Sequence, residues 1–403
     1  MTTTQEENDR LTRIGPGTPM GNLLRRYWHP VGIESELAQD PVRRVRWFGE
    51  DLTLFRSERG EYGLIDDRCP HRCLSLEYGI PDECGLRCAY HGWLFDTQGR
   101  CLEQPYEDLA HPEGRFKDEI RIKSYPVEAL GGFVWAYFGP EPRPLLPRWD
   151  VLVRDDLDRA IEVFTLPCNW LQCMDNSADP VHFEFLHARF GNYQEKKRGR
   201  PPAMNPARHV KIAFDLFKYG IYKRRLLEGE PETSDDWVVG HPILFPTTLA
   251  QGGANAPGLQ IRVPIDDTHT VQILYRTMKR KPGAPPLPIA VTHTKLFDEN
   301  GKLAANTIPH QDALAWVGQG PISDRTREHL ATSDRGVVLY HKLLLEQMER
   351  VEQGLEPMAV IRDRAENEPM IELNREARTL DAFASRYDNS FGKIQELAGT
   401  AAK

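Results

Sequence analysis

The stretch of sequence that decides the fold is CPHRCLSLEYGIPDECGLRCAYHGW, residues 69–93. It contains two short groups that each pair one cysteine with one histidine. The first is Cys69-x-His71, and the second, after sixteen intervening residues, is Cys88-x-x-His91. Thiolate and imidazole groups are common protein ligands of iron and zinc. The two groups therefore predict a metal centre held by two sulfur and two nitrogen donors.

Two kinds of centre fit these donors. A structural zinc site usually pairs like with like, CxxC in one half and HxxxH in the other, whereas each half is mixed here. Two β-hairpin tips that each supply one Cys and one His suit a Rieske-type [2Fe–2S] cluster, with both cysteines on one iron and both histidines on the other. We therefore predict that Cys69, His71, Cys88 and His91 hold a Rieske cluster, with structural zinc as the alternative. Cys73, Cys84 and Cys101 lie outside the motif and are expected to be free thiols.

The segments around this motif predict a β-rich first domain. Residues 42–64 are strand-like with turns near Gly49 and Gly60, and residues 131–139, GGFVWAYFG, form a further strand. Residues 20–28 are expected to form a short helix. Residues 140–148, PEPRPLLPR, hold four prolines and are typical of a linker. We expect a Rieske domain over 1–148, including the N-terminal helical segment, and a second domain over 149–403.

The second domain shows strands of an antiparallel sheet and a long helix. Four segments have strand character: 211–217, 219–227, 259–265 and 269–280. Residues 336–353 have helical periodicity. This mixture of a sheet and separate helices predicts an α+β fold.

A second group of metal-binding side chains lies in NWLQCMDNSADPVHFEFLH, residues 169–187. Mononuclear non-haem iron oxygenases use two histidines and one carboxylate on one face of Fe(II). His182 and His187 supply a histidine pair, but residues five apart on a regular helix are separated by roughly 140°. We therefore predict a helix end or a π-type irregularity between them. Asp179, three residues before His182, is expected to accept a hydrogen bond from its imidazole.

The third iron ligand is expected from a carboxylate far along the chain. We choose Asp312 in the segment HQDA, residues 310–313. Asp324, Asp334 and Asp363 are the alternatives, and for any single aspartate a helix cap or a surface charge is the ordinary interpretation.

The composition excludes some classes of function. The formal net charge is −8, and a mildly acidic chain lacks the basic footprint of nucleic-acid-binding proteins. The polar start MTTTQEENDR does not have the form of a signal peptide, and no apolar stretch is long enough to span a bilayer. We therefore expect a cytoplasmic protein. GxGxxG and P-loop patterns are absent from the sequence, so it shows no sign of a nicotinamide, flavin or nucleotide site of its own.

These motifs together resemble those of Rieske non-haem iron oxygenase α-subunits of the phthalate dioxygenase group. The resemblance rests on GPGTPMGNLLRRYWHPVG (15–32), CPHRCLSLEYGI (69–80), CAYHGWLFD (88–96), the segment 169–187 and QDALAWVGQGPISDR (311–325). It implies a C-terminal helix-grip catalytic domain with a central antiparallel sheet. It also implies a head-to-tail homotrimer, in which the cluster of one subunit faces the mononuclear iron of the next. Asp179 would then link His182 to His91 of the partner subunit, and Asn176 would lie close to the iron.

The resemblance also implies the reaction and its partners. A separate reductase with FMN and a plant-type [2Fe–2S] cluster would deliver electrons from NADH. The expected reaction is dihydroxylation or monohydroxylation of a small aromatic, carboxylated substrate with O2. O- or N-demethylation is the alternative, and an electron-transfer protein without oxygenase activity is a second one. Arg208, Lys211 and Arg262 are candidates for pairing with a substrate carboxylate, although surface charge is the favoured interpretation of each.

Overall fold

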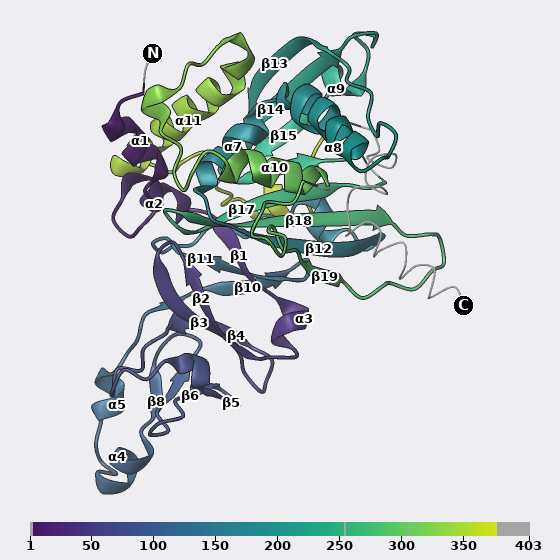
Figure 1. The fold of residues 1–403 in the computed structure, drawn as a ribbon. Coiled ribbons are helices and arrows are strands. Elements are labelled where there is room, and N and C mark those ends of the chain that lie inside the picture. Colours follow the sequence, from purple (N-terminus) through teal and green to yellow (C-terminus); the bar gives the residue numbers. More distant parts are fainter. Residues whose placement is uncertain (1–2, 254, 306, 377–403) are drawn as a thin grey trace. The chain divides into compact units, whose positions relative to one another are not determined.

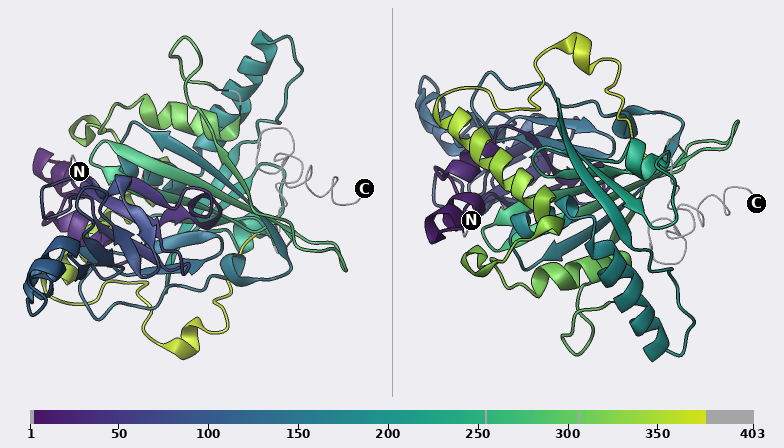
Figure 2. Two further views of the ribbon diagram at one scale, coloured as in Figure 1. Left: turned by 90° about the horizontal axis from the view of Figure 1, so that it is seen from below. Right: turned by 90° about the horizontal axis from the view of Figure 1, so that it is seen from above.

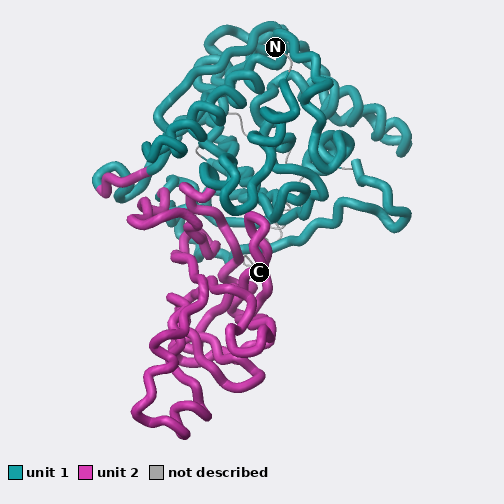
Figure 3. The backbone as a smooth tube through the Cα atoms, turned by 90° about the vertical axis from the view of Figure 1, so that its left-hand side faces the viewer, with its two compact units in different colours: residues 1–24, 148–360, 365–403 teal, residues 25–147, 361–364 magenta. Residues whose placement is uncertain are grey.

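The computed structural model describes residues 3–253, 255–305 and 307–376. These residues fall into two compact units, drawn in different colours in Figure 3. The cluster unit comprises residues 25–147 and 361–364, and the large-sheet unit comprises the described parts of 1–24, 148–360 and 365–403. We describe each unit by itself.

The division differs from the expected domains at residues 1–24 and at residues 361–364, which belong to the cluster unit. A boundary falls between Pro147 and Arg148, but residues 1–24 belong to the large-sheet unit and not to the Rieske domain. The physical reason is the packing of the N-terminal helices α1 (Gln5–Thr12) and α2 (Pro19–Leu24). Both lie beside helix α11 (Arg335–Glu352), as Figures 1 and 2 show. Their apolar side chains, including Leu11 and Met20, are buried there.

The cluster unit consists of three small antiparallel sheets with the strand orders β1-β11-β10, β2-β3-β4-β9 and β5-β6-β7-β8. Its strands are β1 (Trp28–Ile33), β2 (Val42–Trp47), β3 (Glu50–Arg56), β4 (Tyr62–Asp66), β5 (Ile80–Asp82), β6 (Gly85–Arg87), β7 (Leu94–Asp96), β8 (Cys101–Glu103), β9 (Ser124–Tyr125), β10 (Val127–Leu130) and β11 (Phe133–Tyr137). Its helices are α3 (Glu34–Leu37), η1 (Leu76–Tyr78), α4 (Pro105–Ala110) and α5 (Phe116–Glu119).

The predicted strands of this unit are present, and the first turn has a clear cause. Strands β2 and β3 pair so that Trp47 faces Glu50, which leaves a two-residue turn. Phe48 and Gly49 both have positive φ, 52° and 77°, as a type I′ hairpin requires. The helix expected over residues 20–28 is wrong at its C-terminal end, because Trp28 begins strand β1 and pairs with Tyr137 of β11.

The large-sheet unit is built on an eight-stranded sheet with the order β13-β14-β15-β16-β17-β18-β12-β19. Every neighbouring pair in it is antiparallel except β12 with β19, which run parallel. The strands are β12 (Leu157–Leu166), β13 (His209–Phe217), β14 (Gly220–Leu227), β15 (His241–Leu244), β16 (Thr248–Gln251), β17 (Gly258–Asp266), β18 (His269–Lys279) and β19 (Ala290–His293). The sheet and its helices confirm the predicted α+β fold with a central antiparallel sheet.

The remaining helices pack against this sheet and against one another. They are α6 (Asp150–Val153), α7 (Trp170–Ala178), the π-helix η2 (Phe183–Phe190), α8 (Gly191–Lys197), α9 (Asp235–Val238), α10 (Ile308–Val317), η3 (Arg325–Arg327), η4 (Thr332–Asp334) and α12 (Arg364–Asn367). Helix α7 contacts strand β17, and α10 and α11 both contact α7 (Figure 1). Among the described residues, no helix combines the length and apolar character that crossing a membrane requires.

Candidate metal centres and catalytic cavity

Two loop tips with the same backbone geometry carry the Cys/His motif in the cluster unit. At Cys69 and at Cys88, the cysteine amide donates to the carbonyl oxygen five residues later, at 3.0 and 2.8 Å. Each cysteine carbonyl also accepts from the amide four residues later, at 2.8 and 3.0 Å. That fourth residue is Cys73 in one tip and Gly92 in the other, and both have positive φ. The two tips therefore share one backbone hydrogen-bond pattern, although the histidine follows its cysteine by two residues in the first tip and by three in the second.

The four predicted cluster ligands separate into a buried sulfur pair and an exposed nitrogen pair. Cys69 and Cys88 are 2% and 3% exposed and their thiols contact each other. His71 and His91 are exposed, and their ring centroids lie 4.4 Å apart. Among the described residues, these four side chains do not form a compact group of donors around a single point. A single tetrahedral zinc needs all its donors within about 4 Å of each other, so the arrangement fits a two-iron cluster better.

Aromatic rings support the two histidines. Trp93 stacks on His71 with the ring planes 5° apart, and Tyr90 lies against His91 with a centroid distance of 3.8 Å. Burial raises the pKa of the Cys69 thiol to about 12 in the metal-free protein. A bound metal must therefore displace the thiol protons before sulfur can act as a ligand.

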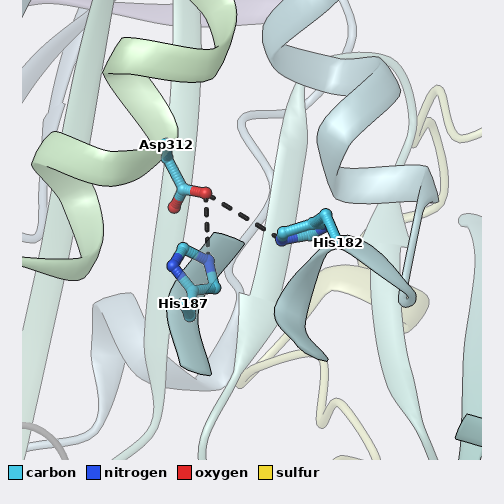
Figure 4. A group of neighbouring side chains, drawn as sticks. All are labelled: His182, His187 and Asp312. Carbon is cyan, nitrogen blue, oxygen red and sulfur yellow. Dashed lines mark ion pairs between the residues drawn. The ribbon is translucent and has the colours of Figure 1, made fainter. Parts of the chain in front are cut away.

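His182, His187 and Asp312 come together in the large-sheet unit, as Figure 4 shows. Their candidate ligand atoms all lie within 4.8 Å of one another. An oxygen of Asp312 is 3.1 Å from Nε2 of His187 and 3.9 Å from Nε2 of His182. All three side chains are mostly buried, with exposures of 18%, 2% and 10% in the order given. Two imidazoles and one carboxylate that converge in this way have the donor set of a mononuclear iron site.

The backbone between the two histidines explains how they can share one site. Helix α7 ends at Ala178, because Asp179 precedes a proline and is extended, with φ −102° and ψ 115°. His182 then caps the π-helix η2, which contains His187. The wider turn of a π-helix brings residues five apart to the same side. The predicted π-type irregularity is therefore confirmed.

Asp179 lies beside His182 for a different reason from the one expected. A spacing of three residues predicts that both residues share one helical face, but Asp179 lies outside the helix. Its carboxylate instead accepts hydrogen bonds from the backbone amides of Val181 and His182, at 2.7 and 3.2 Å. This turn holds the Asp179 carboxylate 3.5 Å from Nδ1 of His182. Burial alone would raise the pKa of Asp179, but the interactions with His182 and the amide of Val181 lower it.

Two amide side chains complete the surroundings of the triad. Oε1 of Gln311 lies 3.0 Å from Nδ1 of His187. If Nδ1 carries the proton and donates it to this oxygen, Nε2 is left with a free lone pair facing Asp312. The Asn176 amide donates to the Asp312 carboxylate at 3.4 Å, so Asn176 is near the triad as expected. The sequence analysis did not identify Gln311.

The three alternative aspartates have other roles or positions. Asp324 accepts hydrogen bonds from the amide and hydroxyl of Thr326 and caps a short helical turn. Asp334 accepts from the amide of Ala331. Asp363 belongs to the cluster unit and not to the unit that contains the two histidines.

A cavity of about 120 Å³ opens beside the triad. One wall is formed by residues of the helices and their connections: Asn176, Ser177, Pro180, His182, Phe183, His187, Ile308, Pro309 and Asp312. The opposite wall is formed by residues of the sheet: Lys223, Arg225, His241, Leu249, Gln251, Gln260 and Arg276. The lysine and the arginines of the lining all belong to the sheet, so the sheet wall is the cationic side of the cavity.

The cationic residues of the cavity are not those that the sequence suggested. Arg208 and Lys211 are exposed, in agreement with the surface interpretation. Arg262 is fully buried, so the surface interpretation is wrong for it. Its guanidinium donates to the side-chain oxygen of Gln260 at 2.8 Å. Lys223 was missed, although on β14 it is in phase with the buried Ile221, which was a usable signal.

Comparisons with known proteins agree with these features. The family described as Rieske [2Fe-2S] domain matches residues 27–126, and the family described as LigXa C-terminal domain like matches residues 297–375. The chain is 44% identical to the 5,5'-dehydrodivanillate O-demethylase oxygenase subunit of Sphingobium sp., over 92% of this chain and 87% of that protein. It is 35% identical to the phenoxybenzoate dioxygenase subunit alpha of Ectopseudomonas oleovorans, over 87% of each chain. The phthalate 4,5-dioxygenase oxygenase subunit of Pseudomonas putida is 32% identical, again over 87% of each chain.

Solved structures show the same fold. NdmA of Pseudomonas putida has a TM-score of 0.61 and 18% identity, covering 92% of this chain and 97% of that one. The terminal oxygenase of carbazole 1,9a-dioxygenase from a Novosphingobium species has a TM-score of 0.59 and 19% identity, covering 84% and 96%. Because curated relatives more than 30% identical span most of its length and its first unit is a Rieske [2Fe-2S] domain, the chain belongs to the Rieske non-haem iron oxygenases, as an oxygenase α-subunit.

Proposed function

We propose that this α-subunit oxidises a small aromatic, carboxylated substrate with O2, using electrons that a separate reductase supplies. The observation that carries the proposal is the convergence of His182, His187 and Asp312 on the wall of a cavity of about 120 Å³. Cys69, His71, Cys88 and His91 would hold the Rieske cluster, and the triad would hold a single ferrous ion. Together these groups supply electron storage and O2 activation when they are bound.

The protein's own residues prepare the site for this chemistry. Gln311 holds the His187 ring so that the Nε2 atom of this ring faces the Asp312 carboxylate. Asn176 hydrogen-bonds to the Asp312 carboxylate and restricts its rotation. Phe183, Pro180 and the other apolar lining residues exclude water and leave a space of about 120 Å³ for a substrate ring.

Asp179 is the proposed link between the two metal centres. Its carboxylate lies 3.5 Å from Nδ1 of His182 and remains 24% exposed. In a head-to-tail homotrimer this exposed side would reach His91 of the partner subunit, as in the family that the sequence resembles. Asp179 would then accept and release the His182 proton as electrons arrive.

Removal of an O-methyl group is one candidate reaction. The relative that is 44% identical over 92% of this chain is named as an O-demethylase. Oxidation of a methyl C–H bond next to oxygen gives a hemiacetal, which loses formaldehyde. Ring dihydroxylation is the second candidate, since the phenoxybenzoate and phthalate relatives are named as dioxygenases. The electrons would come from NADH through a reductase with FMN and a plant-type [2Fe–2S] cluster.

Metal analysis and product analysis test the proposal together. We expect three irons per chain, two in the cluster and one in the triad. The reduced protein, given O2 and a panel of benzoates, phthalates and methoxybenzoates, should form oxidised products that mass spectrometry identifies. Formaldehyde release would indicate demethylation, and a mass gain of two oxygens with two hydrogens would indicate dihydroxylation. Two irons per chain with no product from the panel would instead indicate an electron-transfer protein.

A further inference from the structure

Lys223 is a buried cation in the wall of the catalytic cavity. It lies in strand β14, where it is the cross-strand partner of His241 in β15, and it is only 7% exposed. Its side chain lines the same cavity as His182 and Asp312, on the opposite wall. A lysine is rarely buried to this extent unless its charge is paired or has a function.

Lys223 has no carboxylate partner among the described residues. No hydrogen bond or ion pair of its amino group occurs in the part of the chain that the structure describes. The neighbouring Arg225 differs, because its guanidinium donates to Asp236 at 3.0 Å and is thereby neutralised. Arg225 is therefore a cation paired with a carboxylate, whereas Lys223 has no such partner within hydrogen-bonding distance among the described residues.

Lys223 shares the sheet wall of the cavity with Arg225 and Arg276, so this side of the cavity is cationic. Asp179 and Asp312 contribute two negative charges near Lys223, and their interaction with it is electrostatic at longer range. A ferrous ion in the triad would carry two positive charges and would cancel them. The charge of Lys223 would then remain uncompensated in a buried place, which is costly unless a negative group binds there.

We propose that Lys223 binds the carboxylate of the aromatic substrate and makes the cavity selective for anionic rings. This inference rests on the proposed function and names the residue that recognises its substrate class. The carboxylate would lie at the sheet wall, and the ring would extend towards the triad. The apolar lining residues Phe183, Ile308 and Leu249 are available to contact the two ring faces.

A matched pair of ligands tests the proposal. 3-Methoxybenzoate and 3-methoxybenzamide are close in size and shape but differ by one negative charge. Calorimetric titration of the iron-loaded holoprotein, without O2, measures binding independently of turnover. We expect the wild-type protein to bind the benzoate at least about tenfold more tightly than the benzamide, because a charge-assisted hydrogen bond is worth more than a neutral one.

Two substitutions and one control complete the test. Lys223→Met keeps most of the side-chain volume and removes the charge, so it should weaken benzoate binding by about 10- to 100-fold and leave benzamide binding nearly unchanged. Lys223→Arg should keep the preference for the acid. Lys211→Met removes an exposed lysine that pairs with Glu232, and should change neither affinity.

Three results would overturn the inference. They are equal wild-type affinities for the acid and the amide, a preference for the acid that persists in Lys223→Met, and no binding of benzoate, phthalate or 3-methoxybenzoate. Each is distinguishable from failure of the proposed function, which is judged by three irons per chain and O2-dependent product formation. If Lys223→Met does not fold, the wild-type ligand pair and Lys223→Arg still decide the question.

Discussion

Gln311 provides a sharp test of how this chain positions His187, a proposed iron ligand. Its Oε1 accepts the hydrogen bond of His187 at Nδ1, at 3.0 Å, and the His187 side chain is 2% exposed. Gln311→Leu removes the acceptor while keeping a similar volume. No water can easily replace the lost partner, because the imidazole is almost fully buried.

The expected magnitude follows from the buried donor. Leaving one buried polar group without a partner costs about 1–3 kcal/mol. Since about 1.4 kcal/mol corresponds to a tenfold change in an equilibrium constant, this range spans roughly 5- to 150-fold. Loss of an outer hydrogen-bond partner of a metal-bound histidine typically weakens metal binding by about 10- to 100-fold. We therefore expect Gln311→Leu to bind iron about 10- to 100-fold more weakly than the wild type.

Competition with a chelator, followed by iron analysis, measures this change. The absorption spectrum of the Rieske cluster serves as an internal control, because Gln311 lies in the other unit. Gln311→Glu should keep the affinity, since a carboxylate also accepts the Nδ1 proton. Gln319→Leu, an exposed position just after the same helix α10, is the matched control. Equal iron affinities for Gln311→Leu and Gln319→Leu would refute the reasoning.

Three further predictions concern other parts of the chain. Asp179→Ala should nearly abolish turnover while iron analysis still gives three irons per chain, because Asp179 is outside the triad; loss of the third iron would contradict its bridging role. Cys73→Gly should raise the free energy of unfolding by up to about 1 kcal/mol in urea titrations, because the φ of 58° is unfavourable for a residue with a Cβ atom; a clear decrease would count against this. Burial lowers the pKa of His209 to about 4, so the folded protein keeps this ring neutral while the unfolded chain protonates it near its ordinary pKa of about 6.5. The stabilising contribution of the neutral ring is therefore complete above about pH 6.5 and is lost as the pH falls towards about 4. Urea unfolding at pH 7 and pH 5 checks this, because the free energy of unfolding should fall less between these two pH values in His209→Asn than in the wild type.

Short-range chemistry was predictable from the sequence. The spacing of Cys69, His71, Cys88 and His91 indicated the Rieske domain, because the cluster ligands lie on two short loop tips. The five-residue gap between His182 and His187 required an irregular helix, and η2 provides it. The position of Asp179 beside His182 was predicted, but its cause was not, because the effect of the following proline on the helix end was overlooked.

Long-range packing was much harder to predict. Asp312 was a choice among four aspartates, and its role as a ligand stays a prediction although the structure brings it to the histidines. Nothing local in the sequence tells which side of a helix such as α10 faces α7. The burial of Arg262 was misread for the same reason, since burial of a cationic side chain depends on what covers that face of the sheet; for Lys223, the alternation with the buried Ile221 was a local signal.

Gln172 shows how the two halves of the triad are held at a fixed distance. It lies in helix α7, is fully buried, and donates from Nε2 to the carbonyl oxygens of Trp316 and Gly320, at 2.7 and 2.9 Å. Its Oε1 accepts from the amide of Ser323 at 3.0 Å. These three bonds join the helix that leads to the histidines to the end of α10 and the segment after it. Because metal–ligand distances tolerate changes of only about 0.2 Å, a buried amide that touches none of the three donors can still determine whether they bind iron.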